Sequence, residues 1–187
     1  MKGCLVAGGL AVLLAIVVGM MAMGMYNGIV AKDEACIKAW GNVESVLQRR
    51  FDLIPNLVNT VKGYAAHEKD VLEEVTRLRS QWGEAKTQAE KVGVASMLEG
   101  AMGRLMVVME NYPDLKANQN FIALQDELAG TENRINVERQ RYNEAVQAYN
   151  VTIRQMPTAL VAGLKGFVSR TPFEAAQGAE TAPTVQF

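Results

Sequence analysis

The sequence predicts an all-α protein, in which an amino-terminal transmembrane helix precedes an antiparallel four-helix bundle with long helices. Two observations carry this prediction. The run from Gly3 to Tyr26 contains no charged residue, and it exceeds the roughly 20 residues that a helix needs to cross a bilayer core. After this run, apolar residues recur at intervals of three and four, and no stretch alternates convincingly with the two-residue period of a strand.

The composition suits one domain with additional segments. The chain has 187 residues, of which 49% are hydrophobic and 21% are charged. The chain has 19 Lys and Arg and 20 Asp and Glu, so its net charge is −1. This balance excludes the strongly basic character expected of a nucleic-acid-binding protein. We expect a transmembrane anchor at 1–26, a helical bundle at 27–168 and an extended or disordered tail at 169–187.

The apolar run has three interpretations. A cleaved signal peptide would use the small residues Ala22 and Gly24, but its apolar core is usually only about 7–15 residues long. A lipoprotein signal would place its cysteine after the run, whereas Cys4 precedes it. An uncleaved signal anchor therefore fits best. Because Lys2 precedes the span and no clear positive excess follows it, the positive-inside tendency places the amino terminus in the cytoplasm.

Small residues occupy every fourth position of this span. On a helix they form a narrow, smooth stripe along which two backbones can approach closely. Such residues are also common in membrane helices that stay single. We expect self-association through the stripe, which consists of Ala7, Ala11, Ala15 and Gly19.

Four amphipathic helices are expected after the span. The first ends near "RRFD" and the second begins at "LIPN", where Asp52 is a candidate amino-terminal cap and Pro55 suits a first turn. The alternative is a kink in one longer helix. The second helix ends near Gly83, the third occupies about 92–109, and the fourth extends from about 115 to 155, where Pro157 stops it.

No residue pattern points to catalysis or to a cofactor. His67 is the only histidine, and the metal-binding HExxH and CxxC spacings are absent from the sequence. Glu73, Glu74, Glu127 and Glu132 suit bundle surfaces at least as well as a dinuclear metal site. We therefore expect no enzyme activity, no bound metal and no cofactor.

Polar residues lie close to the apolar positions of the first, second and fourth helices. Tyr-Asn pairs recur seven residues apart, which returns to nearly the same helix face. Such residues can fix the register between helices, or they can line a groove for a ligand or partner. We expect the polar residues around "RRFDLIPN" to form a corner of the bundle and to face Glu127 and Glu132 or their surroundings. The polar layer or groove consists of Arg49, Arg50, Asp52, Asn56, Glu127, Glu132, Arg134, Tyr142 and Tyr149.

The tail ends in "PTVQF", in which Pro183, Val185 and Phe187 are isolated anchors. Val185 and Phe187 would share one side of an extended strand. A terminal hydrophobic residue of this kind can dock in a neighbouring groove, and a frayed end is the simpler alternative. Cys36 is either a small core residue or a bridge to a neighbouring subunit.

Three long blocks resemble the signature segments of the bacterial LemA family: "AWGNVESVLQRRFDLIPNLVNTVKGYAAHE", "YPDLKANQNFIALQDELAGTENRI" and "RYNEAVQAYNVTIRQMP". The amino-terminal anchor and the "PTVQF" ending are similar too. The resemblance implies a membrane-anchored helical bundle. We expect it in the bacterial inner membrane, and a cytoplasmic amino terminus would place its domain in the periplasm or otherwise outside the cytoplasm. It supplies no catalytic residues. It also suggests a membrane-protein partner, such as a protease.

The sequence thus favours a non-enzymatic scaffold that is anchored in the lipid bilayer, forms a homo-oligomer and organises or shapes the membrane. The motivating features are the small-residue stripe, the missing catalytic motifs and the tail motif. The alternative is an envelope sensor or adaptor that binds a ligand or peptide.

Overall fold

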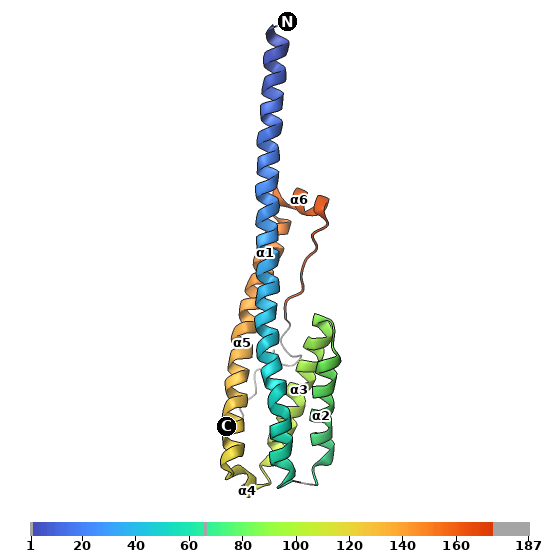
Figure 1. Ribbon diagram of the computed structural model, residues 1–187, viewed down its shortest axis with the longest axis vertical. Coiled ribbons are helices and arrows are strands. Elements are labelled where there is room, and N and C mark those ends of the chain that lie inside the picture. Colours follow the sequence, from blue (N-terminus) through green and yellow to red (C-terminus); the bar gives the residue numbers. More distant parts are fainter. Residues whose placement is uncertain (1, 66, 174–187) are drawn as a thin grey trace, which may run out of the picture. The chain divides into compact units, whose positions relative to one another are not determined.

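A computed structural model describes residues 2–65 and 67–173, with side chains from Gly8 onward. Helices dominate these residues, and no strand occurs among them, which confirms the all-α prediction. The predicted tail anchors Pro183, Val185 and Phe187 lie outside the described residues. The helices are α1 (Lys2–Lys62), α2 (Lys69–Glu84), α3 (Gln88–Met109), α4 (Pro113–Lys116), α5 (Gln119–Arg154) and α6 (Thr158–Lys165) (Figure 1).

The described residues fall into two compact units. The first comprises residues up to 41 together with 140–172, and the second comprises 42–139 together with residue 173. Helices α1 and α5 each contribute residues to both units.

The predicted helix boundary at "RRFDLIPN" is wrong. Helix α1 continues through this stretch to Lys62, with Pro55 inside it. Proline has no N–H to donate to the carbonyl of Phe51, one turn earlier. Phe51, Ile54 and Leu57 are nearly inaccessible to solvent, and their packing offsets the lost hydrogen bond. The alternative of one longer helix therefore holds, and the chain turns after Lys62 instead.

Asp52 is consequently not a helix cap. It lies in the middle of α1 and accepts a hydrogen bond of 2.8 Å from the amide of Gln48, one turn before it. The expected bundle corner at Arg49 to Asp52 is therefore wrong, because these residues belong to one continuous helix.

The second unit is held together by an apolar core between α1, α2, α3 and α5. The ring of Phe51 stacks on Trp82, with centroids 4.5 Å apart and an interplanar angle of 15°. The indole N–H of Trp82 donates to the side-chain oxygen of Gln48 at 2.6 Å. Further buried side chains come from all four helices: Leu47, Leu57, Val61, Leu72, Val75, Leu78, Leu98, Leu105, Met109, Phe121, Leu128 and Ile135.

Helix α3 begins with a capping box. The Thr87 hydroxyl accepts from the backbone N–H of Glu90 at 3.2 Å, and the Glu90 carboxylate accepts from the N–H groups of Thr87 at 3.1 Å and Lys86 at 2.8 Å. These bonds satisfy donors that a helix start leaves unpaired. The backbone N–H of Lys86, followed by that of Thr87, holds the pKa of Glu90 below its ordinary value.

The fourth predicted helix is interrupted near its start. The short helix α4 ends at Lys116, and Asn118 accepts from the backbone N–H groups of Asn120 and Phe121 before α5 begins. This cap places Phe121 in the core and leaves Ile122 exposed.

The first unit combines α1 up to Gly41 with the last part of α5, α6 and the segment after α6. Its core includes Ile29, Val146 and Tyr149. Cys36 is completely buried, and this burial raises the pKa of its thiol although Arg170 acts in the opposite direction. The interpretation of Cys36 as a core residue is confirmed.

Candidate functional site

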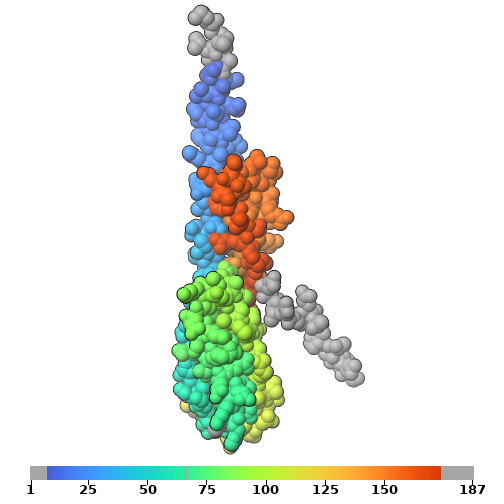
Figure 2. Space-filling view, turned by 90° about the vertical axis from the view of Figure 1, so that its right-hand side faces the viewer, coloured from blue at the N-terminus to red at the C-terminus, as the bar shows by residue number. Residues whose placement is uncertain are grey.

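The amino-terminal part of α1 is an apolar helix without a protein cover. Every residue from Gly8 to Met21 is exposed, including Leu10, Leu13 and Leu14. Figure 2 shows this blue part of α1 without another described segment beside it. Its most apolar window has a mean hydropathy of 2.2 with none of the window buried. The position of this apolar segment near the amino terminus and the exposure of its side chains indicate membrane association.

Among the described residues, α3 is a second helix long and apolar enough to cross a membrane. Its most apolar window has a mean hydropathy of 1.4, and 39% of it is buried. Ala101, Leu105 and Met109 of α3 are in the core of the second unit. We therefore assign α3 to that core, since such a core helix passes the same test of length and composition.

The small-residue stripe has a defined geometry for three of its four members. Ala11, Ala15 and Gly19 are exposed on α1, and a Cβ built on Gly19 would meet no atom within 4 Å. The side chain of Ala7 lies outside the described part. No described residue covers the stripe.

Two arginines on adjacent positions of α1 pair with two glutamates on α5. Arg49 donates to Glu127 at 2.9 Å, and both side chains remain substantially exposed. Arg50 donates to Glu132 at 2.5 Å and is buried, with its side chain 9% exposed. An exposed pair adds at most about 1 kcal/mol. Removing Glu132 would leave the charge of the buried Arg50 without compensation, so this pair favours the register in which the two residues meet.

The other predicted polar residues of this region do not join these pairs. Asp52 accepts from Gln48, Asn56 is exposed, and Arg134 is exposed on α5. The Thr60 hydroxyl donates to the backbone carbonyl of Asn56.

Tyr142 and Tyr149 hold the segment that follows α6, which we call the strap (residues 166–172). The Tyr149 hydroxyl donates to the carbonyl of Val168 at 3.0 Å, and the Tyr142 hydroxyl donates to the carbonyl of Thr171 at 3.1 Å. Both rings are almost completely buried, so neither lines an open groove. Burial raises the pKa of Tyr149.

Asn150 adds a two-point contact to the strap. Its amide donates to the carbonyl of Arg170 at 2.8 Å and accepts from the N–H of Arg170 at 2.9 Å. The Arg170 guanidinium donates to Asp33 of α1 at 2.7 Å. The seven-residue repeat of Tyr-Asn pairs was visible in the sequence, but nothing in it identified the strap as the partner.

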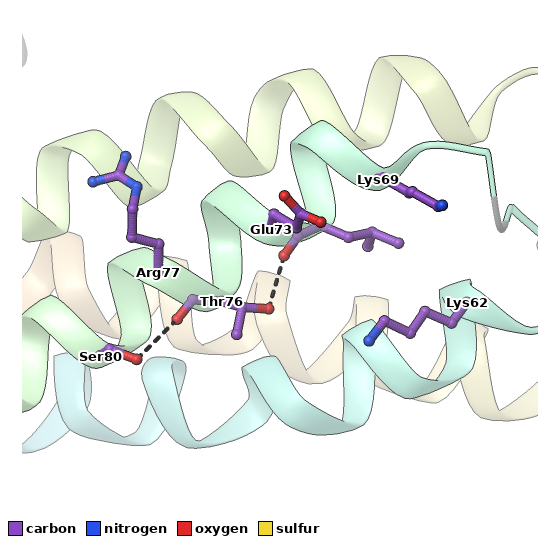
Figure 3. A pocket seen from close by; sticks show the side chains of 7 residues that line it. Lys62, Lys69, Glu73, Thr76, Arg77 and Ser80 are labelled. Atoms are coloured by element: carbon purple, nitrogen blue, oxygen red, sulfur yellow. Dashed lines mark hydrogen bonds between the residues drawn. The ribbon is translucent and has the colours of Figure 1, made fainter.

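The second unit also contains a groove that the sequence did not indicate. It has a volume of about 710 Å³ and lies between the end of α1 and α2. Lys62, Lys69, Glu73 and Arg77 supply its charges, and buried Leu72 supplies apolar surface. The hydroxyls of Thr76 and Ser80 donate to carbonyls of their own helix (Figure 3). The lining of the groove thus combines three cations and one carboxylate with apolar surface.

Metal-ligating side chains do not gather in the described chain. No group of three His, Cys, Asp or Glu side chains that could hold a metal ion occurs among the described residues. His67 is exposed in the turn between α1 and α2.

Comparisons with known proteins agree with the expected family. The LemA family profile matches residues 39–187. Magnetosome protein MamQ 2 of Paramagnetospirillum magneticum is 28% identical over 83% of this chain and 67% of its own length. Magnetosome protein MamQ of Magnetospirillum gryphiswaldense is 27% identical over 76% of this chain and 62% of its own length. Protein LemA of Metamycoplasma hominis is 23% identical over 75% of this chain and 64% of its own length.

The chain thus spans about two thirds of the length of these relatives. The family match covers most of the chain, including the buried Arg50–Glu132 pair, the Tyr-Asn repeat and the strap. On this match, the chain belongs to the LemA family.

Proposed function

We propose that this protein is a non-enzymatic scaffold that is anchored in the bacterial inner membrane, self-assembles there and organises or shapes the bilayer. The observation that carries the proposal is the bare, apolar first part of α1. An apolar helix surface on all sides is stable only when something other than water surrounds it. Lipid meets this requirement, and a second copy meets it along the stripe of Ala11, Ala15 and Gly19.

The soluble part of the proposed scaffold is an antiparallel four-helix bundle. The contacts among α1, α2, α3 and α5 support this arrangement, because each helix supplies core residues and the connections between successive helices are short. The relatives named as magnetosome proteins support a role at a membrane. No residue constellation in the described chain favours catalysis.

The domain is proposed to lie outside the cytoplasm. Lys2 before the span supports this orientation through the positive-inside tendency. Protease treatment of spheroplasts tests it, with digestion of the domain expected. A domain that resists protease until the membrane is permeabilised would contradict this orientation.

Self-assembly is tested by measuring the oligomer size of the full chain in lipid nanodiscs and native membranes. Ala11→Leu with Ala15→Leu should lower the fraction of oligomer, because the added side chains separate the two backbones. The matched control is Leu13→Ile with Val17→Leu, which changes the opposite face and should leave the oligomer intact. A wild-type chain that remains monomeric in both settings, or equal loss in both variants, would count against the scaffold.

A second candidate function is a sensor or adaptor that binds a ligand or peptide, and the groove between α1 and α2 favours it. Labelled acidic and basic peptides titrated onto the full chain provide the test. Lys69→Glu with Arg77→Glu should weaken binding of acidic peptides, whereas Arg79→Glu, which is exposed outside the groove, serves as the control. Peptide binding that ignores both variants would dismiss the groove as a site.

A further inference from the structure

We propose that α6 is a second membrane contact, which lies in the interface beside the point where α1 leaves the bilayer and inserts its apolar face among lipid chains. The inference rests on the proposed membrane anchor. It adds an element that neither the apolar span nor the family match assigns to the membrane.

The first reason is the place of α6 along α1. The ring of Phe167, two residues after α6, packs against Tyr26 with centroids 5.9 Å apart, and the Lys165 ammonium lies 5.7 Å from the centre of the same ring. Tyr26 is the last residue of the predicted membrane anchor, and the first charged residue after it is Lys32. Tyrosine favours the boundary between membrane and water. A bilayer that covers the span therefore ends beside α6, which Figure 1 shows next to α1.

The second reason is an apolar face that no described residue covers. Leu160 and Leu164 lie one turn apart on α6 and are 60% and 88% exposed. Met156 before the helix and Val168 after it are 71% and 74% exposed. Ala162, between the two leucines, is buried on the opposite side. Four large apolar side chains of one short segment thus face away from the protein.

The third reason is charge. Between Glu144 and Glu174 the sequence has three basic residues and no acidic residue. Arg170 is engaged by Asp33, whereas Arg154 and Lys165 are exposed at the ends of α5 and α6. A short apolar helix with cations beside it suits the surface of a membrane that contains anionic lipid. The acidic residues of this unit are Asp33, Glu34 and Glu144, of which Asp33 is paired with Arg170 and Glu144 accepts a hydrogen bond from Gln140.

The fourth reason is that α6 is held in position. Gly166 ends the helix in the left-handed conformation with φ 75°, which favours glycine, and the N–H of Phe167 then donates to the carbonyl of Ala162. Tyr149 and Asn150 fix the strap that follows. These contacts hold the apolar face of α6 next to Tyr26, so the face can meet the membrane without a movement of the chain.

The test places an environment-sensitive fluorophore on α6 in the full chain, reconstituted in nanodiscs of phosphatidylcholine with and without phosphatidylglycerol. Cys4 is replaced by serine, and buried Cys36 remains and serves as the unlabelled background. Leu164→Cys carries the probe, and Gln147→Cys, which is exposed on α5, is the control position. We expect a blue-shifted emission and quenching by acyl-chain nitroxide lipids at position 164 and neither at position 147.

Two outcomes would overturn the inference. A probe at position 164 that is as accessible to water-soluble quencher as one at position 147 would show that no bilayer covers α6. A probe that is protected from water but not quenched by nitroxide lipids would show that a protein covers it. Carbonate extraction of proteoliposomes with the same lipids keeps the two proposals distinct. Release of the chain refutes the anchor, whereas retention with an exposed probe refutes only the role of α6.

A second set of variants tests the chemistry of the contact without risk to the core. Leu160→Gln, with the probe kept at position 164, should lose nitroxide quenching while carbonate resistance persists. Lys165→Gln with Arg154→Gln should remove the gain in quenching that phosphatidylglycerol provides and leave quenching in phosphatidylcholine unchanged. An unchanged response to phosphatidylglycerol would contradict the role of the two cations.

Discussion

Helix α1 passes through two different environments along one continuous backbone. From Gly8 to Met21 it is apolar on all sides and touches no described part of the protein. From Asn42 to Lys62 it has a buried face and a polar face, and Phe51, Ile54 and Leu57 form part of a protein core. Both parts are helical, so helicity alone does not determine whether a part of α1 meets lipid or protein. The distribution of apolar residues around the helix decides whether lipid or protein covers it.

The largest effect is expected from charged residues in the exposed apolar part of α1, between Gly8 and Met21. Leu14→Arg with Val18→Arg should prevent stable insertion, because each arginine near the centre of a span costs about 2.5–3.5 kcal/mol. The carbonate-resistant fraction measures this loss. Trp82 fluorescence should report unchanged urea unfolding of the second unit. Leu14→Ile with Val18→Ile is the control. Retention of the arginine variant in the membrane would contradict the assignment of this part of α1 to the bilayer.

The opposite experiment removes packing from the covered part. Phe51→Ala should lower the free energy of unfolding of the second unit by about 3–5 kcal/mol, because it removes a buried ring stacked on Trp82. Urea unfolding followed by tryptophan fluorescence measures the change, and carbonate resistance should persist. Exposed Ile37 provides the control as Ile37→Ala, with a small effect expected. Loss of membrane attachment in Phe51→Ala would show that the two parts of α1 are not independent.

A smaller effect is expected for the strap. Asn150→Ala removes two hydrogen bonds to the Arg170 backbone and should weaken strap attachment by about 1–3 kcal/mol. Trypsin should then cleave faster after Arg170 in the reconstituted full chain. Gln147→Ala, on the same helix and exposed, should leave the rate unchanged. Equal rates for the two variants would contradict a holding role for Asn150.

The smallest effect concerns the start of α3. Because the folded-state pKa of Glu90 is lowered from 4.5, its contribution to stability is complete above that value and is lost as pH falls through the folded-state pKa. Glu90→Gln should therefore lose stability at neutral pH and should show less further loss on acidification than the wild type. Urea unfolding at pH values on both sides of 4.5 checks this. Glu84→Gln, exposed at the end of α2, is the control.

Much of the helical pattern could be predicted because apolar periodicity is a local property. Among the apolar residues that recur with the helical period, Val43, Leu47, Leu98 and Leu105 are buried. Pro55 could not be placed correctly, since a proline gives the same local signal at a helix start and inside a helix stabilised by packing. The start of α5 depends on the cap at Asn118, which brings Phe121 and not Ile122 to the core, and apolar periodicity alone does not specify this choice.

The candidate site was less predictable, because it depends on pairs that are distant in sequence. The polar residues around Arg50 were visible, but Lys62 and Arg77 meet at a groove only after the chain has turned. Likewise, Tyr149 marked a helix face without revealing that the strap would cover it. Residue types indicated polar contacts, and the fold decided which contacts form.

The strap contacts imply a length-matching rule. Tyr142 and Tyr149 are seven residues apart, about 10.5 Å along a helix at about 1.5 Å per residue. Their acceptors, the carbonyls of Thr171 and Val168, are three residues apart, about 10 Å in an extended chain at about 3.3 Å per residue. The spacing of the two hydroxyl donors on the helix thus matches the spacing of the two carbonyl acceptors on the strap, and the strap runs antiparallel to the helix. An insertion or deletion of one residue between Val168 and Thr171 would break that agreement, whereas a changed side chain at exposed Ser169 would preserve it.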